Sequence, residues 1–146
     1  MRFVRILFAA PLLAANIASA AEAWIVSGRV VGVSDGDTIT VLDADKKQDK
    51  IRISGIDAPE KGQAYGERSR QNFAQMTRDK DARLECHKID RFGREVCKGV
   101  GPATELSRCG KTLDVGLAQM SVGLAWWFSR YSREHTAEDR GRYKSE

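Results

Sequence analysis

Three short segments near the start of the chain place apolar and polar side chains in alternation, with turn residues between them. They cover residues 24–33 (WIVSGRVVGV), 38–42 (TITVL) and 50–54 (KIRIS). Alternation with a period of two, rich in β-branched side chains, indicates strands. The turn at residues 35–37 (DGD) and the polar stretch 43–50 separate them. Consecutive short strands with tight turns predict a meander that curls into a barrel.

The periodicity changes after Pro59. Residues 62–79 and 113–123 repeat apolar side chains at the spacing of amphipathic helices. Residues 82–88 and 94–98 predict a hairpin across the turn 90–93, and the following stretch 99–110, with glycine and proline, predicts a loop. Residues 130–146 are polar and predict a short helix or a frayed end. Because no repeat or linker interrupts this pattern, we expect one α+β domain, mainly β, over residues 24–146.

Composition supports a single globular domain and leaves the partner open. The chain has 146 residues, 42% hydrophobic and 30% charged, which is enough apolar material for one core. With 13 glycines and 3 prolines it is neither collagen-like nor of low complexity. The net charge of +4 is a mild basic bias that is compatible with an anionic partner.

The first 20 residues (MRFVRILFAAPLLAANIASA) have the pattern of a secretory signal peptide. Two arginines precede a short apolar run, and Ala18-Ser19-Ala20 fits a cleavage site. The run is too short to span a bilayer, and Pro11 and Asn16 argue against an ordinary buried helix. We therefore expect cleavage, a protein that does not contact the membrane afterwards, and a periplasmic or secreted location.

Export to an oxidising compartment favours a disulfide among the three cysteines. If the hairpin turns around residues 91 and 92, Cys86 faces Cys97, although directly opposed strand positions are slightly far apart for a bridge. A bond between Cys86 and Cys97 is one hypothesis, and pairing of Cys97 with Cys109 is the alternative.

Acidic and basic side chains gather at strand ends and turns of the predicted barrel. Asp37, Asp57 and Glu60 carry carboxylates, and Arg52 and Arg94 carry guanidinium groups. Each of these motifs taken alone is most often a turn, a solvated strand residue or a helix start. Together they point to chemistry, because clustered carboxylates repel one another unless a hard cation lies among them. Two arginines beside them suit a phosphate, which a guanidinium binds bidentately.

The order of these motifs resembles that of the staphylococcal nuclease-like family. The resemblance covers most of residues 26–131 and is carried by VSDGDTITV (33–41), IRISGIDAPE (51–60), IDRFGREV (89–96) and LDVGLAQMSVGLAW (113–126). It implies a five-stranded OB-type barrel with two to three packed helices. It also implies a monomeric, calcium-dependent endonuclease that hydrolyses DNA and RNA, preferably single-stranded or frayed, to 5′-hydroxyl and 3′-phosphate ends.

The resemblance also implies roles for individual residues. Asp37, Asp57 and the carbonyl of Ala58 match the calcium ligands, and Asp35 supports them from behind. Arg52 and Arg94 would hold the phosphate and stabilise its growing charge, whereas Glu60 would orient or deprotonate the attacking water.

Substrate contacts are less specific. Tyr131 stands where the family stacks a base or ribose, although a core or hinge aromatic fits equally well. Lys61, Lys88 and Arg91 are candidate phosphate contacts. The alternative is that they are ordinary solvent-exposed surface residues. We expect the aromatic run 126–128 to pack inside rather than to bind bases.

Two departures from the family pattern leave other functions open. Residues 99–108 do not have the pattern of the strand that the family places there. The sequence given stops at Glu146, where relatives continue into a further helix. A truncated and less stable domain is therefore an alternative. A catalytically impaired module that binds nucleic acid or protein would keep the fold but lose a catalytic residue. A calcium-binding structural protein would explain the carboxylates but not the two arginines.

Overall fold

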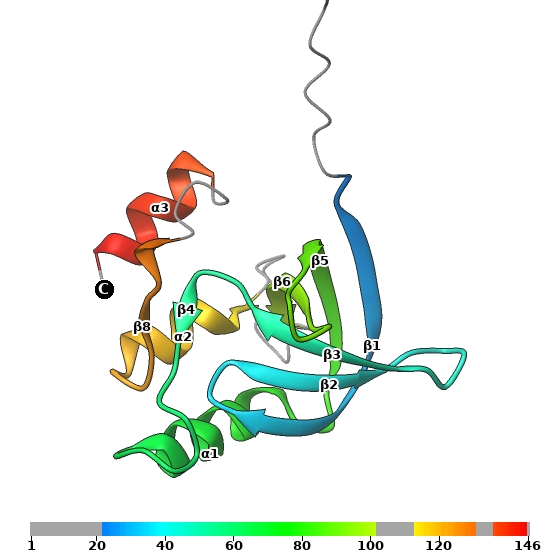
Figure 1. The fold of residues 1–146 in the computed structure, drawn as a ribbon, viewed down its shortest axis with the longest axis horizontal. Coiled ribbons are helices and arrows are strands. Elements are labelled where there is room, and N and C mark those ends of the chain that lie inside the picture. Colours follow the sequence, from blue (N-terminus) through cyan, green and yellow to red (C-terminus); the bar gives the residue numbers. More distant parts are fainter. Residues whose placement is uncertain (1–21, 102–112, 131–135, 146) are drawn as a thin grey trace, which may run out of the picture.

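A computed structural model describes residues 22–101, 113–130 and 136–145. Its largest sheet runs in the order β3-β2-β1-β5-β6-β7, and a parallel pairing of β3 with β6 closes the first five of these strands into a barrel (Figure 1). The strands are β1 (Trp24–Asp35), β2 (Thr38–Leu42), β3 (Gln48–Ile53), β5 (Asp81–Ile89), β6 (Glu95–Gly101) and the short β7 (Leu113–Asp114). The expected five-stranded OB-type barrel is confirmed.

A second, two-stranded sheet lies outside the barrel. The strands β4 (Ile56–Asp57) and β8 (Trp126–Trp127) pair antiparallel, with Ile56 opposite Trp127 and Asp57 opposite Trp126. The pairing ties the segment that follows β3 to the chain beyond the helices, and it continues in the hydrogen bond from the Phe128 amide to the Gly55 carbonyl, 2.9 Å long.

The core fills the barrel and the space under its helices. Alternate strand residues such as Val30, Ile51 and Leu84 are almost completely buried, as the period-two pattern requires. Helix α1 (Gly66–Thr77) contributes Phe73, which is also fully buried. Register shifts in β1 at residues 30–35 bend this long strand, as β-bulges do, so that one strand pairs with both β2 and β5.

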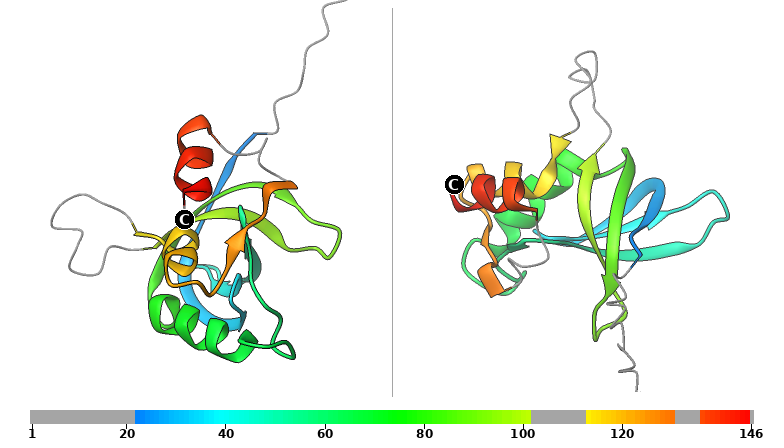
Figure 2. Two further views of the ribbon diagram at one scale, coloured as in Figure 1. Left: turned by 90° about the vertical axis from the view of Figure 1, so that its left-hand side faces the viewer. Right: turned by 90° about the horizontal axis from the view of Figure 1, so that it is seen from above.

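Two further helices pack at one end of the barrel (Figure 2). Asp114 begins α2 (Val115–Ser121) by accepting hydrogen bonds from the amides of residues 116 and 117. Helix α3 (Ala137–Lys144) is attached by the Tyr143 hydroxyl, which donates to Asp114 at 2.8 Å, and by Asp139, which lies 2.6 Å from Lys98 Nζ. None of the helices within the described ranges has the length and apolarity that crossing a bilayer requires.

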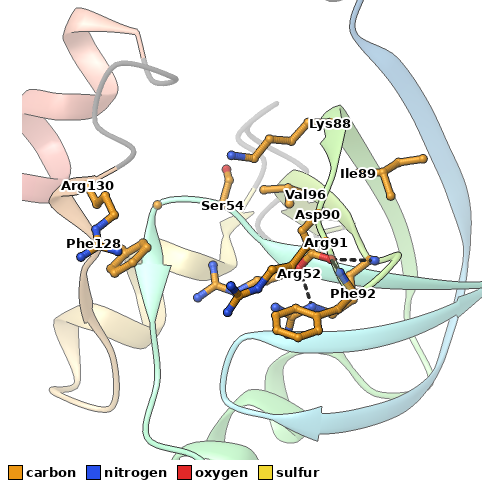
Figure 3. A pocket seen from close by; sticks show the side chains of 12 residues that line it. Arg52, Ser54, Lys88, Ile89, Asp90, Arg91, Phe92, Val96, Phe128 and Arg130 are labelled. Atoms are coloured by element: carbon orange, nitrogen blue, oxygen red, sulfur yellow. Dashed lines mark hydrogen bonds and ion pairs between the residues drawn. The ribbon is translucent and has the colours of Figure 1, made fainter.

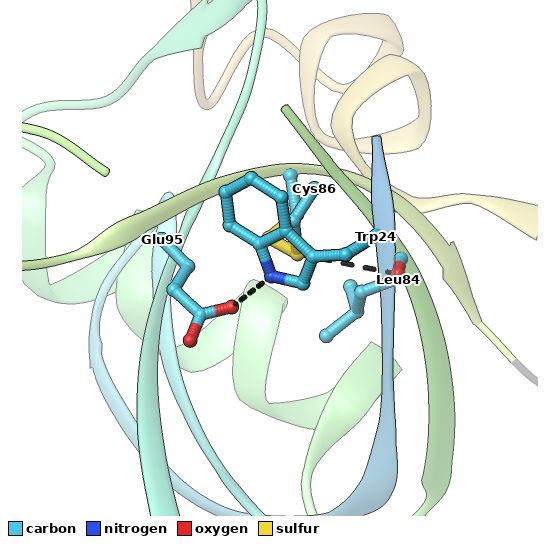
Figure 4. Close-up of a disulfide and its surroundings, with 5 residues drawn as sticks. Trp24, Leu84, Cys86 and Glu95 are labelled. Carbon is cyan, nitrogen blue, oxygen red and sulfur yellow. Dashed lines mark hydrogen bonds between the residues drawn. A yellow bond between two sulfur atoms is a disulfide. The ribbon is translucent and has the colours of Figure 1, made fainter. Parts of the chain in front are cut away.

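A disulfide joins Cys86 on β5 to Cys97 on β6, which is one of the two pairings that the sequence left open. Residues 83–86 have the partners that a turn centred on residues 91 and 92 gives them. The register shifts by one residue at His87, so residues 88 and 89, nearer the turn, pair one position further along than that turn would give. The indole of Trp24 lies beside the bond and donates to Glu95 Oε2 at 2.9 Å (Figure 4). The alternative pairing of Cys97 with Cys109 does not occur in this structure, and Cys109 itself lies outside the described residues.

Several expected boundaries are wrong. The third strand begins two residues earlier, at Gln48, and the helices are shorter than expected at both ends. Strand β6 continues to Gly101, so residues 99–101 pair with β5 and β7 instead of forming a loop. Gly99 is compatible with this strand because α2 packs against it: a Cβ there would lie 2.6 Å from Val115 Cγ2. The remainder of the expected loop, the expected signal peptide and Tyr131 lie outside the described residues.

Candidate active site

The turn between β1 and β2 buries the carboxylate of Asp37. Only 6% of the residue is exposed, and it accepts hydrogen bonds from Thr38 Oγ1 (2.8 Å) and the Ala58 amide (3.3 Å). Asp35 accepts a hydrogen bond from the Asp37 amide and so supports the turn. Gly36 lets α1 approach closely, because a Cβ at this position would overlap the Ser69 hydroxyl.

Arg52 connects the two predicted metal ligands. It extends from β3 directly opposite Thr38, and its Nη2 lies 2.8 Å from Asp57 Oδ1 and 3.3 Å from Asp37 Oδ2. Both carboxylates therefore point towards the same positive group. Asp57 is partly exposed, whereas the Arg52 side chain is 14% exposed, so the guanidinium is largely withdrawn from water.

Burial also changes the charge state of Asp37. Desolvation raises the pKa of its carboxyl from 3.8 to about 7, against the lowering effect of the Arg52 guanidinium, and the nearby Asp35 carboxylate adds to the increase. Burial therefore opposes the negative charge of Asp37, whereas the Arg52 guanidinium favours it.

Arg94 reaches the same place from the β5–β6 hairpin. Asp90 accepts hydrogen bonds from the amides of Phe92 (2.9 Å) and Arg94 (3.0 Å) and from Arg94 Nε (2.8 Å). The Arg94 Nη1 group then donates to Thr38 Oγ1 at 3.4 Å, next to Asp37. Asp90 thus positions Arg94, a role that sequence reasoning missed although it singled out this turn.

Arg52 and Arg94 both line a pocket of about 470 Å³. Figure 3 shows Arg52 among the side chains around it. Its charged lining is mostly cationic, with Asp90 as the acidic member, and two aromatic rings flank it. The Arg52 guanidinium lies 5.8 Å from the Phe128 ring centroid, and that of Arg94 lies 5.4 Å from the Phe92 centroid. The charged and aromatic lining residues are Arg52, Lys88, Asp90, Arg91, Phe92, Arg94, Phe128 and Arg130. Such a lining suits an anionic ligand that carries flat rings.

The structure separates the remaining predicted site residues. Arg91 and Lys88 line the pocket, whereas Lys61 and Glu60 are exposed and do not. The Glu60 backbone is held in a tight loop, in which its amide donates to Gln63 Oε1 and its carbonyl accepts from the Gln63 amide, both at 2.8 Å. Over the described ranges, the Glu60 carboxylate makes no hydrogen bond or ion pair, so it is not held against the arginines.

A hard cation fits the donor set of Asp37 and Asp57. Both supply the carboxylate oxygens that Ca²⁺ prefers, and positive charge near the buried Asp37 would favour its ionised form. Two protein carboxylates do not complete its shell of six to eight oxygens. Among the described residues, one group of three His, Cys, Asp or Glu side chains has its ligand atoms within 4.8 Å of one another, namely Cys86, Glu95 and Cys97. Its two cysteines are joined in the disulfide. For such an ion, the other oxygens would come from backbone carbonyls, water or substrate.

The protein thus combines a closed β-barrel with a mostly cationic pocket beside a carboxylate pair, and sequence comparisons identify the family to which it belongs. The profile of the staphylococcal nuclease homologue family matches residues 50–145. A micrococcal nuclease of Shigella flexneri is 32% identical over 76% of this chain, an uncharacterized endonuclease of Haemophilus influenzae is 32% identical over 89%, and protein ParB of Escherichia coli is 37% identical over 78%. The chain covers 63%, 68% and 64% of these three relatives, respectively. It belongs to the staphylococcal nuclease homologue family.

Proposed function

We propose that the protein is a calcium-dependent endonuclease that hydrolyses phosphodiester bonds of DNA and RNA and leaves 5′-hydroxyl and 3′-phosphate ends. The observation that carries the proposal is the convergence of Arg52 and Arg94 on one pocket, with Asp37 and Asp57 directly behind Arg52. The relatives that are named nucleases support the same reaction class.

The two guanidinium groups suit the charge of the reaction. A phosphodiester anion bound in the pocket would meet one donor from β3 and one from the β5–β6 hairpin, and these donors are already oriented by Asp57 and Asp90. Preoriented donors stabilise the extra negative charge of the transition state without reorganising. Glu60 orients or deprotonates the attacking water in this proposal; its exposed position requires the loop or the substrate to bring the carboxylate to the phosphate.

Asp37, Asp57 and the Ala58 carbonyl would hold the calcium ion. When bound, the ion supplies charge neutralisation and a point of attachment for a phosphate oxygen. The chain's own part is to bury Asp37, to keep Asp57 within reach and to place Arg52 against both.

The test is cleavage of single-stranded DNA, duplex DNA and RNA by purified protein, with Ca²⁺ or with a chelator. We expect cutting only with Ca²⁺, faster on single strands, and end analysis should find 5′-hydroxyl and 3′-phosphate groups. Arg52→Ala should abolish cutting, whereas Arg83→Ala, which removes an exposed arginine outside the pocket, should not. Binding of nucleic acid without any cutting would instead identify an impaired binding module, and Ca²⁺ binding without nucleic acid a structural protein.

We also propose that residues 1–20 are removed on export and that the mature protein is a soluble monomer in the periplasm or medium. The Cys86–Cys97 disulfide supports an oxidising compartment. Cell fractionation, N-terminal sequencing and the mass in solution test these three points. An uncleaved protein in the cytoplasm would contradict the proposal.

A further inference from the structure

The small β4–β8 sheet has one buried face and one face towards the site. Ile56 is fully buried, and Trp127, directly opposite it, packs against the core. Successive strand residues point to opposite faces, and directly opposed residues share a face. Asp57 and Trp126 therefore lie together on the other face, next to the carboxylate that binds Arg52.

Phe128 belongs to this same face, because it is two residues beyond Trp126 and opposite Gly55. The Arg52 guanidinium lies over the Phe128 ring and binds Asp57. Side chains two residues apart on a strand are about 7 Å apart. Trp126 therefore stands about 7 Å along the strand from Phe128, whose ring the Arg52 guanidinium covers.

Trp126 is unusual among the three residues of the aromatic run because it is 48% exposed. This corrects the expectation that the whole run packs inside. Phe92, on the opposite side of the pocket, is also exposed, but the guanidinium groups of Arg91 and Arg94 lie over its ring at 4.7 and 5.4 Å. Among the described residues, no cation–π contact covers Trp126, so the ring can accept a stacked partner.

We propose that Trp126 is a stacking platform for one unpaired base of a nucleic-acid strand whose neighbouring phosphate lies on Arg52. This inference rests on the proposed function and adds a subsite to it, on the Asp57 side of the pocket. Any base can stack on an indole, so the contact adds affinity without sequence preference. A paired base is unavailable for stacking, so the platform favours single strands over duplexes.

The test compares wild type, Trp126→Ala and Trp126→Phe in two assays. Binding of a fluorescent single-stranded oligonucleotide is measured by anisotropy in a chelator, and cleavage of the same strand is measured with Ca²⁺. Loss of one base–aromatic stack should weaken binding and raise KM by about 5- to 140-fold with kcat little changed. Trp126→Phe should restore most of the loss. Ile25→Ala, which removes an exposed apolar side chain from β1, is the matched control and should change neither.

Single abasic substitutions along the strand locate the contact. One position should weaken wild-type binding as much as Trp126→Ala does, and the variant should be insensitive to the missing base at that position. Unchanged binding by Trp126→Ala, equal losses on duplex and single strand, or undiminished sensitivity at every position would overturn the platform. If wild type binds but does not cut, the proposed function fails while the anisotropy series still decides the platform. Absence of any wild-type binding overturns both.

Discussion

Reduction of the Cys86–Cys97 bond should destabilise the fold by an amount that the hairpin length sets. The bond closes a loop with a sequence separation of 11. Its removal returns conformational freedom to the unfolded chain, and the chain-entropy relation gives about 2.8 kcal/mol at 25 °C for a loop of this size. Both cysteines are fully buried, so reduction, which keeps the sulfur atoms, isolates this effect better than substitution, which would add a cavity.

Urea unfolding of a Cys109→Ser variant, with and without reductant, measures the effect without thiol exchange from the third cysteine. With a urea dependence of about 1–3 kcal/mol per molar, reduction should lower the midpoint by roughly 1–3 M. A variant that also carries Cys86→Ala and Cys97→Ala should not respond to reductant. If thiol titration proves that the bond has opened and the midpoint nevertheless stays within about 0.2 M, the entropic reasoning is refuted.

Three further predictions concern single side chains. Arg94→Ala should lower kcat/KM by about 10²–10³-fold with an unchanged circular dichroism spectrum, and near-normal cleavage would exclude Arg94 from the reaction. Asp90→Asn should lower Tm at pH 7. Partial burial acts to raise the Asp90 pKa, but hydrogen bonds from Arg94 and Phe92 outweigh it and lower the pKa of the folded protein below 3.8. The difference in Tm between variant and wild type should therefore vanish as the pH falls through this lowered pKa. A difference in Tm that stays constant with pH would contradict this. Gly99→Ala should lower the free energy of unfolding, measured in urea, by about 1–3 kcal/mol because the new methyl group overlaps Val115. An unchanged free energy of unfolding would show that α2 moves aside at little cost.

Local patterns were sufficient for the barrel and much of the pocket. Alternation identified the meander, and the hairpin around Arg94 made the observed Cys86–Cys97 bond one of two candidate pairings. The convergence of Arg52 with Asp37 and Asp57 could also be predicted, because Asp37 lies in a turn and the other two lie near strand ends that follow closely in the sequence. These features depend on residues that are close in sequence or on one strand pairing.

Contacts between distant segments decided what sequence reasoning missed. Gly99 disfavours a strand by its own propensity, but α2 packs against that position and glycine leaves the room. Trp126 was expected inside because an aromatic run is usually core, yet its pairing with Asp57, 69 positions earlier in the numbering, turns its ring outwards. The role of Asp90 was detectable in principle, since an acid four residues before Arg94 across a turn with Gly93 is a typical local anchor.

The parallel seam between β3 and β6 joins Arg52 directly opposite Val96, two residues after Arg94. The other strand pairs of this sheet are antiparallel. An open five-stranded ribbon could therefore form with all of these pairs made and only the β3–β6 pairing missing. Such a ribbon would contain both arginines that are proposed to hold the phosphate, yet it would place their guanidinium groups at opposite edges. During refolding, cleavage activity should therefore return only when β3 pairs with β6. This recovery should lag behind the earlier gain of the β-sheet signal in circular dichroism.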